Sequence, residues 1–401
     1  MNLNMNMQTN RQFDHGVLAV PSAEEESRQL FVKSLKYHLA TRVAPGNRLA
    51  YERRALPEFR RAHGVPPKDH HEIRSLMSGE GYFQMWSALQ RTSQEMMWRS
   101  VQISVERQND ELRAKVAGGL GRGVSAKRGS LTLDPALVQP KYHTAVDIHC
   151  MPGGYHGEYQ PDDAANGAVY DRAVWIYAMG RMGPLNDDMG QSVCAYLKSQ
   201  RPSVKPARIL DMGCGVGHTT LPYSEHFPEA ELHGIDVGAP MLRYAHARAE
   251  GLGRAVHFSQ QNAEQTSFPD GYFDLIVSHI LVHETSNKAI LRIMKEAFRL
   301  LSPGGLMINL ETPPYGSMPA FDAFMLDWDT RNNNEPFWGA SHELDIRALA
   351  EYGGFGSERA FECVVPSAFE EADAQRTRVF QGGDFGGGGS WYLWGAQKAA
   401  L

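Results

Sequence analysis

Residues 208–217 constrain the fold of this chain more than any other stretch. They read Arg-Ile-Leu-Asp-Met-Gly-Cys-Gly-Val-Gly, so an apolar run ends in Asp211 and three glycines follow at Gly213, Gly215 and Gly217. A segment typical of a helix begins at His218. Strand, glycine turn and helix in this order are typical of the first unit of a nucleotide-binding α/β domain. Because glycine has no Cβ, such a turn lets the backbone approach a ligand closely.

The spacing of the glycines narrows the kind of ligand. A dinucleotide fingerprint needs its third glycine where His218 stands, and the turn lacks the Gly-Lys-Ser/Thr of a phosphate-binding loop. Further apolar runs at residues 230–235, 256–259, 273–278 and 306–310 are predicted strands. The first of these runs is followed by Asp236, whose carboxylate can accept hydrogen bonds from both hydroxyls of a ribose.

This ordered series resembles the class I S-adenosylmethionine-dependent methyltransferases, nearest to the small-molecule branch that includes the ubiquinone-pathway enzymes. The likeness is strong over residues 208–311 and weaker beyond. It implies an α/β fold, a Rossmann-like seven-stranded methyltransferase sheet with helices on both faces, and S-adenosyl-L-methionine as cofactor. The cofactor-binding residues that it implies are Asp211, Gly213, Cys214, Gly215, Gly217, Asp236, Val237, Met241, Asn262, Ala263 and Ser278.

The resemblance also assigns parts of the cofactor to these residues. Asp211 and the glycine turn would face the methionine end, Asp236 would hold the ribose, and Met241 would line the adenine slot. Asn262 stands where the family often has an aspartate near the adenine amino group. Its amide oxygen can still accept that hydrogen bond.

Length and composition limit the remaining possibilities. The chain has 401 residues, enough for two or three domains, and a net charge of -6, which argues against nonspecific binding to nucleic acid. No apolar run approaches the roughly 18 residues of a membrane helix, and the polar residues 1–16 lack a signal-peptide core. Four scattered cysteines favour neither a disulfide framework nor a zinc cluster. We therefore expect a cytoplasmic protein.

Three regions are expected along the chain. Residues 1–20 are predicted to be a disordered tail, residues 21–200 a mainly α-helical N-terminal domain containing a loop at 117–167, and residues 201–401 the cofactor-binding domain. Residues 168–197 are predicted to be helical and to pack on the earlier helices. An apolar stripe at residues 82–103, rich in Met and Trp, suits either a helix-bundle core or a substrate wall. The helical domain would cover the substrate, form a homodimer interface, or both.

Two segments are expected to build the substrate pocket. One is residues 142–156 in the loop, and the other is a lid insertion at 312–340, both of which combine aromatic and polar residues. The candidate substrate-binding residues are Tyr155, Tyr315, Trp328 and Trp338. An alternative interpretation of the loop, a metal site built from Asp147, His149 and His156, fits no standard ligand spacing.

The candidate catalytic residues follow the fourth predicted strand. His279, His283 and Glu284 lie there, at the end of a strand where open α/β sheets bind ligands. His283 is the first choice for a general base, while His279 could position the cofactor. His279 and His283 would share one face if the segment were helical. A metal site of these three residues departs from the acid-and-histidine order of some quinone O-methyltransferases, so no metal is predicted.

The sequence thus predicts methyl transfer to a small, largely apolar or aromatic molecule, with oxygen as the first expected acceptor. Nitrogen, sulfur and carbon acceptors stay open, as does a cofactor-binding protein of this fold that does not methylate. The expected partner is a small-molecule substrate rather than nucleic acid or a membrane.

Overall fold

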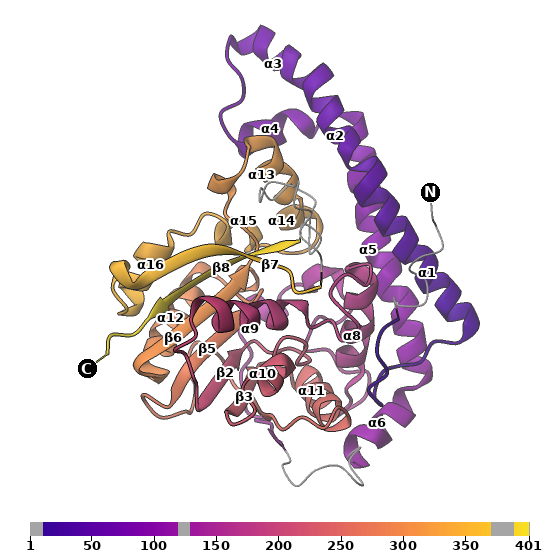
Figure 1. Ribbon diagram of the computed structural model, residues 1–401. Coiled ribbons are helices and arrows are strands. Elements are labelled where there is room, and N and C mark those ends of the chain that lie inside the picture. Colours follow the sequence, from indigo (N-terminus) through magenta and orange to yellow (C-terminus); the bar gives the residue numbers. More distant parts are fainter. Residues whose placement is uncertain (1–10, 119–128, 370–388, 401) are drawn as a thin grey trace.

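A mixed sheet of eight strands forms the centre of the structure, a computed structural model that describes residues 11–118, 129–369 and 389–400 (Figure 1). The strand order is β1-β4-β3-β2-β5-β6-β8-β7, with parallel pairing from β1 to β6 and antiparallel pairing of β8 with β6 and of β7 with β8. The strands are β1 Ser130–Thr132, β2 Arg208–Met212, β3 Glu231–Asp236, β4 His257–Gln260, β5 Phe273–His279, β6 Leu301–Glu311, β7 Ala360–Pro366 and β8 Ser390–Gln397.

The predicted α/β fold is confirmed, with one strand more than the predicted seven. The additional strand, β1, lies in the region expected to be a loop, and Leu131 pairs with Phe258 in β4. In the order of the sheet, β2 lies between β3 and β5. The chain therefore leaves the carboxyl end of β2 at a switch point of the sheet, which is where α/β proteins bind their ligands.

Helices cover both faces of the sheet, as predicted. In β2, Ile209 packs in one core with α9, α10 and α11, while its neighbour Leu210 packs in another with α12 and α16. This alternation is expected because successive strand residues point to opposite faces. The helices have the bounds α9 Asp188–Gln200, α10 Leu221–His226, α11 Ala239–Gly251, α12 Asn287–Leu300 and α16 Ile346–Gly353, with short 3-10 turns η4 Val282–Glu284 and η6 Ser357–Arg359.

The N-terminal half is helical, as predicted, and forms a layer beside the sheet (Figure 1). Ser22 caps α1 through a capping box with Glu25, which explains where the first helix begins. Met97 and Trp98 of α5 share one core with Met241 and Tyr244 of α11. The elements are α1 Ala23–His38, π-helical η1 Leu39–Val43, α2 Pro45–Ala50, π-helical η2 Tyr51–Ala55, α3 Leu56–His63, α4 His70–Met77, α5 Gly81–Arg107, α6 Asn109–Gly118, α7 Lys141–Thr144, η3 Ile148–Cys150 and α8 Ala165–Tyr177.

Two predictions about residues 1–200 were wrong. Residues 11–20 of the expected disordered tail are ordered, with His15 and Val17 buried, while residues 1–10 lie outside the described part of the chain. The predicted helical stretch at 168–197 is two helices, because Gly180, Gly183 and Pro184 interrupt it. Only α8 packs on the N-terminal helices, whereas α9 contributes Val193 to a core of the sheet.

The expected lid insertion follows β6 as a group of short helices: η5 Tyr315–Ser317, α13 Ala320–Leu326, α14 Trp328–Asn332 and α15 Trp338–Ser341. In Figure 1 this group lies between α4 and the sheet. Phe321 and Phe324 of α13 pack in a core with Ile73 of α4 and Trp86 of α5. The lid is therefore joined to the N-terminal helices. Among the described residues, no helix has the length and apolar character needed to cross a bilayer.

Candidate functional site

The glycine turn after β2 is held against the carboxyl end of β3. Gly213 and Gly215 have φ of +73° and +51°, a conformation that glycine adopts without steric cost. The Asp236 carboxylate accepts the Gly215 N–H at 3.0 Å through Oδ2 and the Gly238 N–H at 2.8 Å through Oδ1. Burial raises the pKa of Asp236 to about 6, although these N–H groups lower it. The sequence thus fixes both the position and the orientation of this carboxylate.

A cavity opens beside this turn and brings together most of the residues predicted to bind the cofactor. Tyr155 and Glu284, predicted for substrate binding and catalysis, also line it. We call it the cofactor cavity; the predicted cofactor-binding residues in its wall are Gly213, Gly215, Asp236, Val237, Met241, Asn262 and Ala263.

The other predicted cofactor residues lie elsewhere. Asp211 is fully buried, and its Oδ2 accepts hydrogen bonds from the hydroxyls of Thr219 and Thr220. Ser278 donates to Asn309 Oδ1 at 2.7 Å, and Gly217 shapes the turn with a φ of +76°. None of these three lines the cofactor cavity. Asp211 instead bonds to the residues that follow the turn, and Ser278 joins β5 to β6.

A second cavity adjoins the first. The two share Gly213, Gly215, His279, Ile280 and Tyr170, so they meet at the glycine turn. We call the second one the acceptor cavity. Cys214, predicted for cofactor binding, lines it together with a mainly apolar group from α5, α8, α9 and β8, which includes Trp98, Val174, Met189 and Trp391.

Sequence reasoning found only part of this wall. Trp98 belongs to the stripe that suited either a core or a substrate wall; it packs in a core with α11 and also lines this cavity. Met189 and Trp391 carried no local signal, because strand pairing and helix packing bring them from distant positions.

His279 ends β5 and lines both cavities. Its Nε2 lies 3.2 Å from the hydroxyl of Tyr223, and its Nδ1 lies 3.6 Å from Asp211 Oδ1. The next residue, Ile280, has a φ of +51°, and a single 3-10 turn follows. The condition for a shared helical face of His279 and His283 is therefore not met, because the chain turns between them.

His283 lines the acceptor cavity and pairs with a carboxylate that the sequence analysis missed. Its Nδ1 lies 2.7 Å from Glu311 Oε2, at the carboxyl end of β6. Burial lowers the pKa of His283, but the charge and hydrogen bond of Glu311, together with the charges of Glu335 and Glu284, outweigh this effect and raise it. Glu311 could have been found from its position, since it ends the strand next to β5.

Glu284 faces the loop rather than His283. Its Oε1 accepts hydrogen bonds from His149 Nε2 at 3.2 Å and from the Tyr155 hydroxyl at 2.8 Å. Burial raises the pKa of Glu284, but its hydrogen bonds with His149 and Tyr155 and the charges of His149 and His283 together outweigh this and lower it. On its other side, His149 Nδ1 lies 2.8 Å from Glu335 Oε1 of the lid. The loop and the lid thus meet at His149.

Of the three lid aromatics predicted to bind substrate, Tyr315 and Trp338 pack inside the lid, whereas Trp328 packs against Trp86 of α5. Tyr315 donates to Asp327, Trp328 donates to Ser87 Oγ, and none of the three lines either cavity. Trp338 is fully buried, with its ring centroid 4.7 Å from that of His283. Its effect on the site is through the position of that histidine.

Comparison with known proteins agrees with this geometry. Residues 209–305, which include the glycine turn and Asp236, match the family model of a methyltransferase domain. The chain carries a class I, S-adenosylmethionine-dependent methyltransferase domain. The predicted resemblance to ubiquinone-pathway enzymes is confirmed by the relatives that this part of the chain matches.

Two such relatives are quinone-pathway methyltransferases. The demethylmenaquinone methyltransferase of Thermus thermophilus is 37% identical over 109 residues, which are 27% of this chain and 49% of that protein. The ubiquinone/menaquinone biosynthesis C-methyltransferase UbiE of Vibrio vulnificus is 38% identical over 126 residues, 30% of this chain and 46% of that protein. The chain thus spans about half the length of the curated relatives it matches.

Among solved structures, phosphoethanolamine N-methyltransferase 2 of Haemonchus contortus, in complex with S-adenosyl-L-methionine, is similar at a TM-score of 0.36 and 17% identity. The match covers 51% of each chain.

Proposed function

We propose that this protein transfers a methyl group from S-adenosylmethionine to an oxygen atom of a small, largely apolar or aromatic molecule. The observation that carries the proposal is the pair of adjoining cavities that meet at the glycine turn. One is lined by the residues of the methyltransferase motif, and the other is mainly apolar. Methyl transfer needs this arrangement, because donor and acceptor must lie in line without intervening water.

The residues of the cofactor cavity suit S-adenosylmethionine. Each carboxylate oxygen of Asp236 accepts one backbone N–H and keeps a lone pair for a ribose hydroxyl. A Cβ built on Gly215 would meet nothing within 4 Å, so the turn leaves open space on the cavity side. When bound, the cofactor supplies the electrophilic methyl group, and the chain supplies alignment and exclusion of water.

Oxygen is favoured because the acceptor cavity contains a group that can remove a proton. The carboxylate of Glu311 fixes the proton of His283 on Nδ1, which leaves a lone pair on Nε2. That Nε2 is buried and has no hydrogen-bond partner among the described residues. A hydroxyl of a substrate would supply the missing partner and transfer its proton there.

Carbon is a second candidate acceptor, because one of the relatives is a C-methyltransferase. UbiE is named as a C-methyltransferase and the Thermus thermophilus protein as acting on demethylmenaquinone. Methylation of the ring carbon of a reduced quinone also removes a proton from the acceptor. The same histidine could therefore serve either reaction.

Isotope labelling tests the proposal. Purified protein is incubated with S-adenosylmethionine carrying a deuterated methyl group and with a panel of phenols and reduced quinones. We expect a product that gains one labelled methyl, and NMR distinguishes attachment at oxygen from attachment at carbon. His283→Ala should lower the rate about 10²–10⁴-fold and leave the affinity for S-adenosylhomocysteine unchanged. Tight binding of S-adenosylhomocysteine without transfer to any acceptor, in the panel or in a metabolite extract, would instead indicate a protein that does not methylate.

A further inference from the structure

Two groups of histidine and carboxylate side chains have the geometry of a metal site among the described residues. In each, three ligand atoms lie within 4.8 Å of one another. The inner group is His149, His283 and Glu335, which come from η3, η4 and the segment between α14 and α15. The outer group joins residues of α4 to one beyond α15 and is made of His70, His71 and Glu343.

In the inner group, hydrogen bonds fix the free nitrogen of His283. A carboxylate only accepts, so the 2.7 Å contact with Glu311 Oε2 places the proton on Nδ1. The neutral ring then carries a lone pair on Nε2, which lies 3.9 Å from Glu335 Oε2. Neither Nε2 nor Oε2 has a hydrogen-bond partner in the described structure, and both side chains are 99% buried. The lone pairs of His283 Nε2 and Glu335 Oε2 therefore face one another with no hydrogen-bond donor between them.

His149 repeats this pattern. Its Nε2 donates to Glu284 Oε1 at 3.2 Å, so the neutral ring carries a lone pair on Nδ1. The Asn333 amide nitrogen lies 3.1 Å from this nitrogen and also donates to Glu335 Oε1 at 2.7 Å, so in a metal-bound protein this amide would keep only its bond to Glu335. Glu335 Oε1 lies 2.8 Å from His149 Nδ1. A lone pair and a carboxylate oxygen at this distance repel one another unless a proton or another cation lies between them.

We propose that His149 Nδ1, His283 Nε2 and the Glu335 carboxylate bind one divalent transition-metal ion. Two imidazoles and one carboxylate form a ligand set typical of catalytic zinc and of non-heme iron(II), both of which leave positions open for substrate. The far nitrogen of each histidine is bonded to its own carboxylate, Glu284 or Glu311. Such outer carboxylates orient metal-binding histidines and make them more basic.

The charge of the surroundings favours a dication over protons alone. Glu284, Glu311 and Glu335 place three carboxyl groups around the imidazoles of His149 and His283. A divalent ion offsets this excess of negative charge. It also satisfies the buried atoms of His283 and Glu335 that otherwise lack a partner.

The position of this site suggests its role, which rests on the proposed function. His149 and His283 both line the acceptor cavity. An ion held by them would bind the acceptor oxygen and lower its pKa, so that the acceptor would lose its proton to water and be methylated as an oxyanion, with S-adenosylhomocysteine leaving. In the metal-bound protein His283 Nε2 would be a ligand and could not act as the base. The ion would then take its place in promoting loss of the proton from the acceptor.

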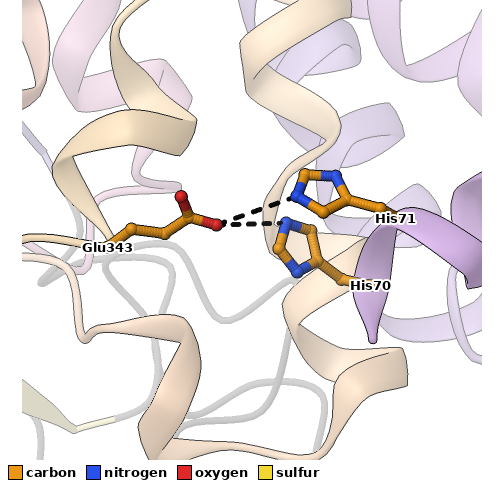
Figure 2. A group of neighbouring side chains, drawn as sticks. All are labelled: His70, His71 and Glu343. Carbon is orange, nitrogen blue, oxygen red and sulfur yellow. Dashed lines mark ion pairs between the residues drawn. The ribbon is translucent and has the colours of Figure 1, made fainter. Parts of the chain in front are cut away.

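The outer group provides a matched control. Figure 2 shows the Glu343 carboxylate facing the imidazoles of His70 and His71, at 3.9 and 3.8 Å. Glu343 and His71 are more than half exposed, and the His70 ring lies tilted against that of Tyr315. Among the described residues, no carboxylate is bonded to Nδ1 of either histidine. The same residue types are therefore present without the burial and support of the inner group.

Cobalt titration of the full chain tests the proposal. Protein stripped with a chelator is titrated with Co²⁺, followed by its visible absorption, and with Zn²⁺ by calorimetry. We expect one equivalent to bind to the wild type and to Glu343→Gln. Glu335→Gln and His149→Gln should each weaken binding by more than about 100-fold, and Glu311→Gln by about 10–100-fold, the usual effect of losing an outer partner. Thermal melts identify variants that fail to fold; if Glu335→Gln does, His149→Gln decides.

Three results would overturn the site: no binding to the wild type, wild-type affinity in the folded inner variants, or loss of the ion in Glu343→Gln. Calorimetry with S-adenosylhomocysteine separates the two proposals. A wild type that binds S-adenosylhomocysteine but no metal refutes only the metal site, whereas one that binds metal but no S-adenosylhomocysteine refutes the proposed function.

Discussion

At the scale of single residues, Asp236 links cofactor binding to pH. Only the ionised carboxylate can accept hydrogen bonds from both ribose hydroxyls, and its pKa of about 6 in the free protein lies within the working range. The affinity for S-adenosylhomocysteine should therefore be constant above about pH 7 and fall below pH 6, by up to about tenfold per pH unit. Calorimetry from pH 5 to pH 8 measures this.

The matched variant is Asp236→Asn, which keeps the size of the side chain but cannot be ionised. It should bind about 1.5–3 kcal/mol more weakly at pH 8, the loss of a hydrogen bond to a charged group. It should also lack the decline between pH 7 and pH 5. A decline of equal size in both proteins would show that another group titrates.

At the scale of elements, the glycine turn allows two reasons for a glycine to be tested separately. One is its backbone conformation, and the other is the space that it leaves for a ligand. Gly215 has a φ of +51°, and a Cβ there meets no protein atom within 4 Å. Gly64, at the end of α3, has a φ of +75° and equally open surroundings. Gly215→Ala and Gly64→Ala should each lower the free energy of unfolding by about 1–2 kcal/mol. Only Gly215→Ala should also weaken binding of S-adenosylhomocysteine, because Gly215 lines the cofactor cavity.

Urea unfolding and calorimetry on both variants measure the two effects. Equal affinity in Gly215→Ala and wild type would show that the cofactor does not approach this part of the turn. Gly213 would be a poorer choice, since its Cβ would lie 2.6 Å from Leu281 and disturb the fold as well.

The same elements show which parts of the structure could be predicted from the sequence. Strands β2 to β6 and the cofactor cavity were predictable because each motif residue lies within a few positions of a strand end. The inner group of His149, His283 and Glu335 was not, because its members lie far apart in the sequence and meet only through the packing of loop and lid. Residue composition marked both segments as unusual, but it did not indicate which side chains would face one another.

At the scale of the whole molecule, one buried carboxylate joins the three parts of the chain. Asp171 of α8 contacts His15 Nε2 at 2.6 Å, His218 Nε2 at 2.7 Å and the Tyr244 hydroxyl at 2.8 Å. These partners come from the N-terminal segment, the end of the glycine turn and α11. Burial raises the pKa of Asp171, but the two histidines outweigh it and lower the pKa well below its usual value. The carboxylate is therefore ionised in the folded protein.

Asp171→Asn should weaken all three attachments together. The amide presents N–H groups to partners that also donate, so the buried His15 and His218 lose a hydrogen-bond acceptor. We expect a loss of about 3–5 kcal/mol in the free energy of unfolding, as for other broken buried pairs. Hydrogen exchange should accelerate in residues 11–20 and in the turn at 215–220. Glu24→Gln, which removes an exposed ion pair with Arg28, should change neither quantity. If exchange in Asp171→Asn accelerates only within α8, the carboxylate stabilises its own helix and does not join the parts.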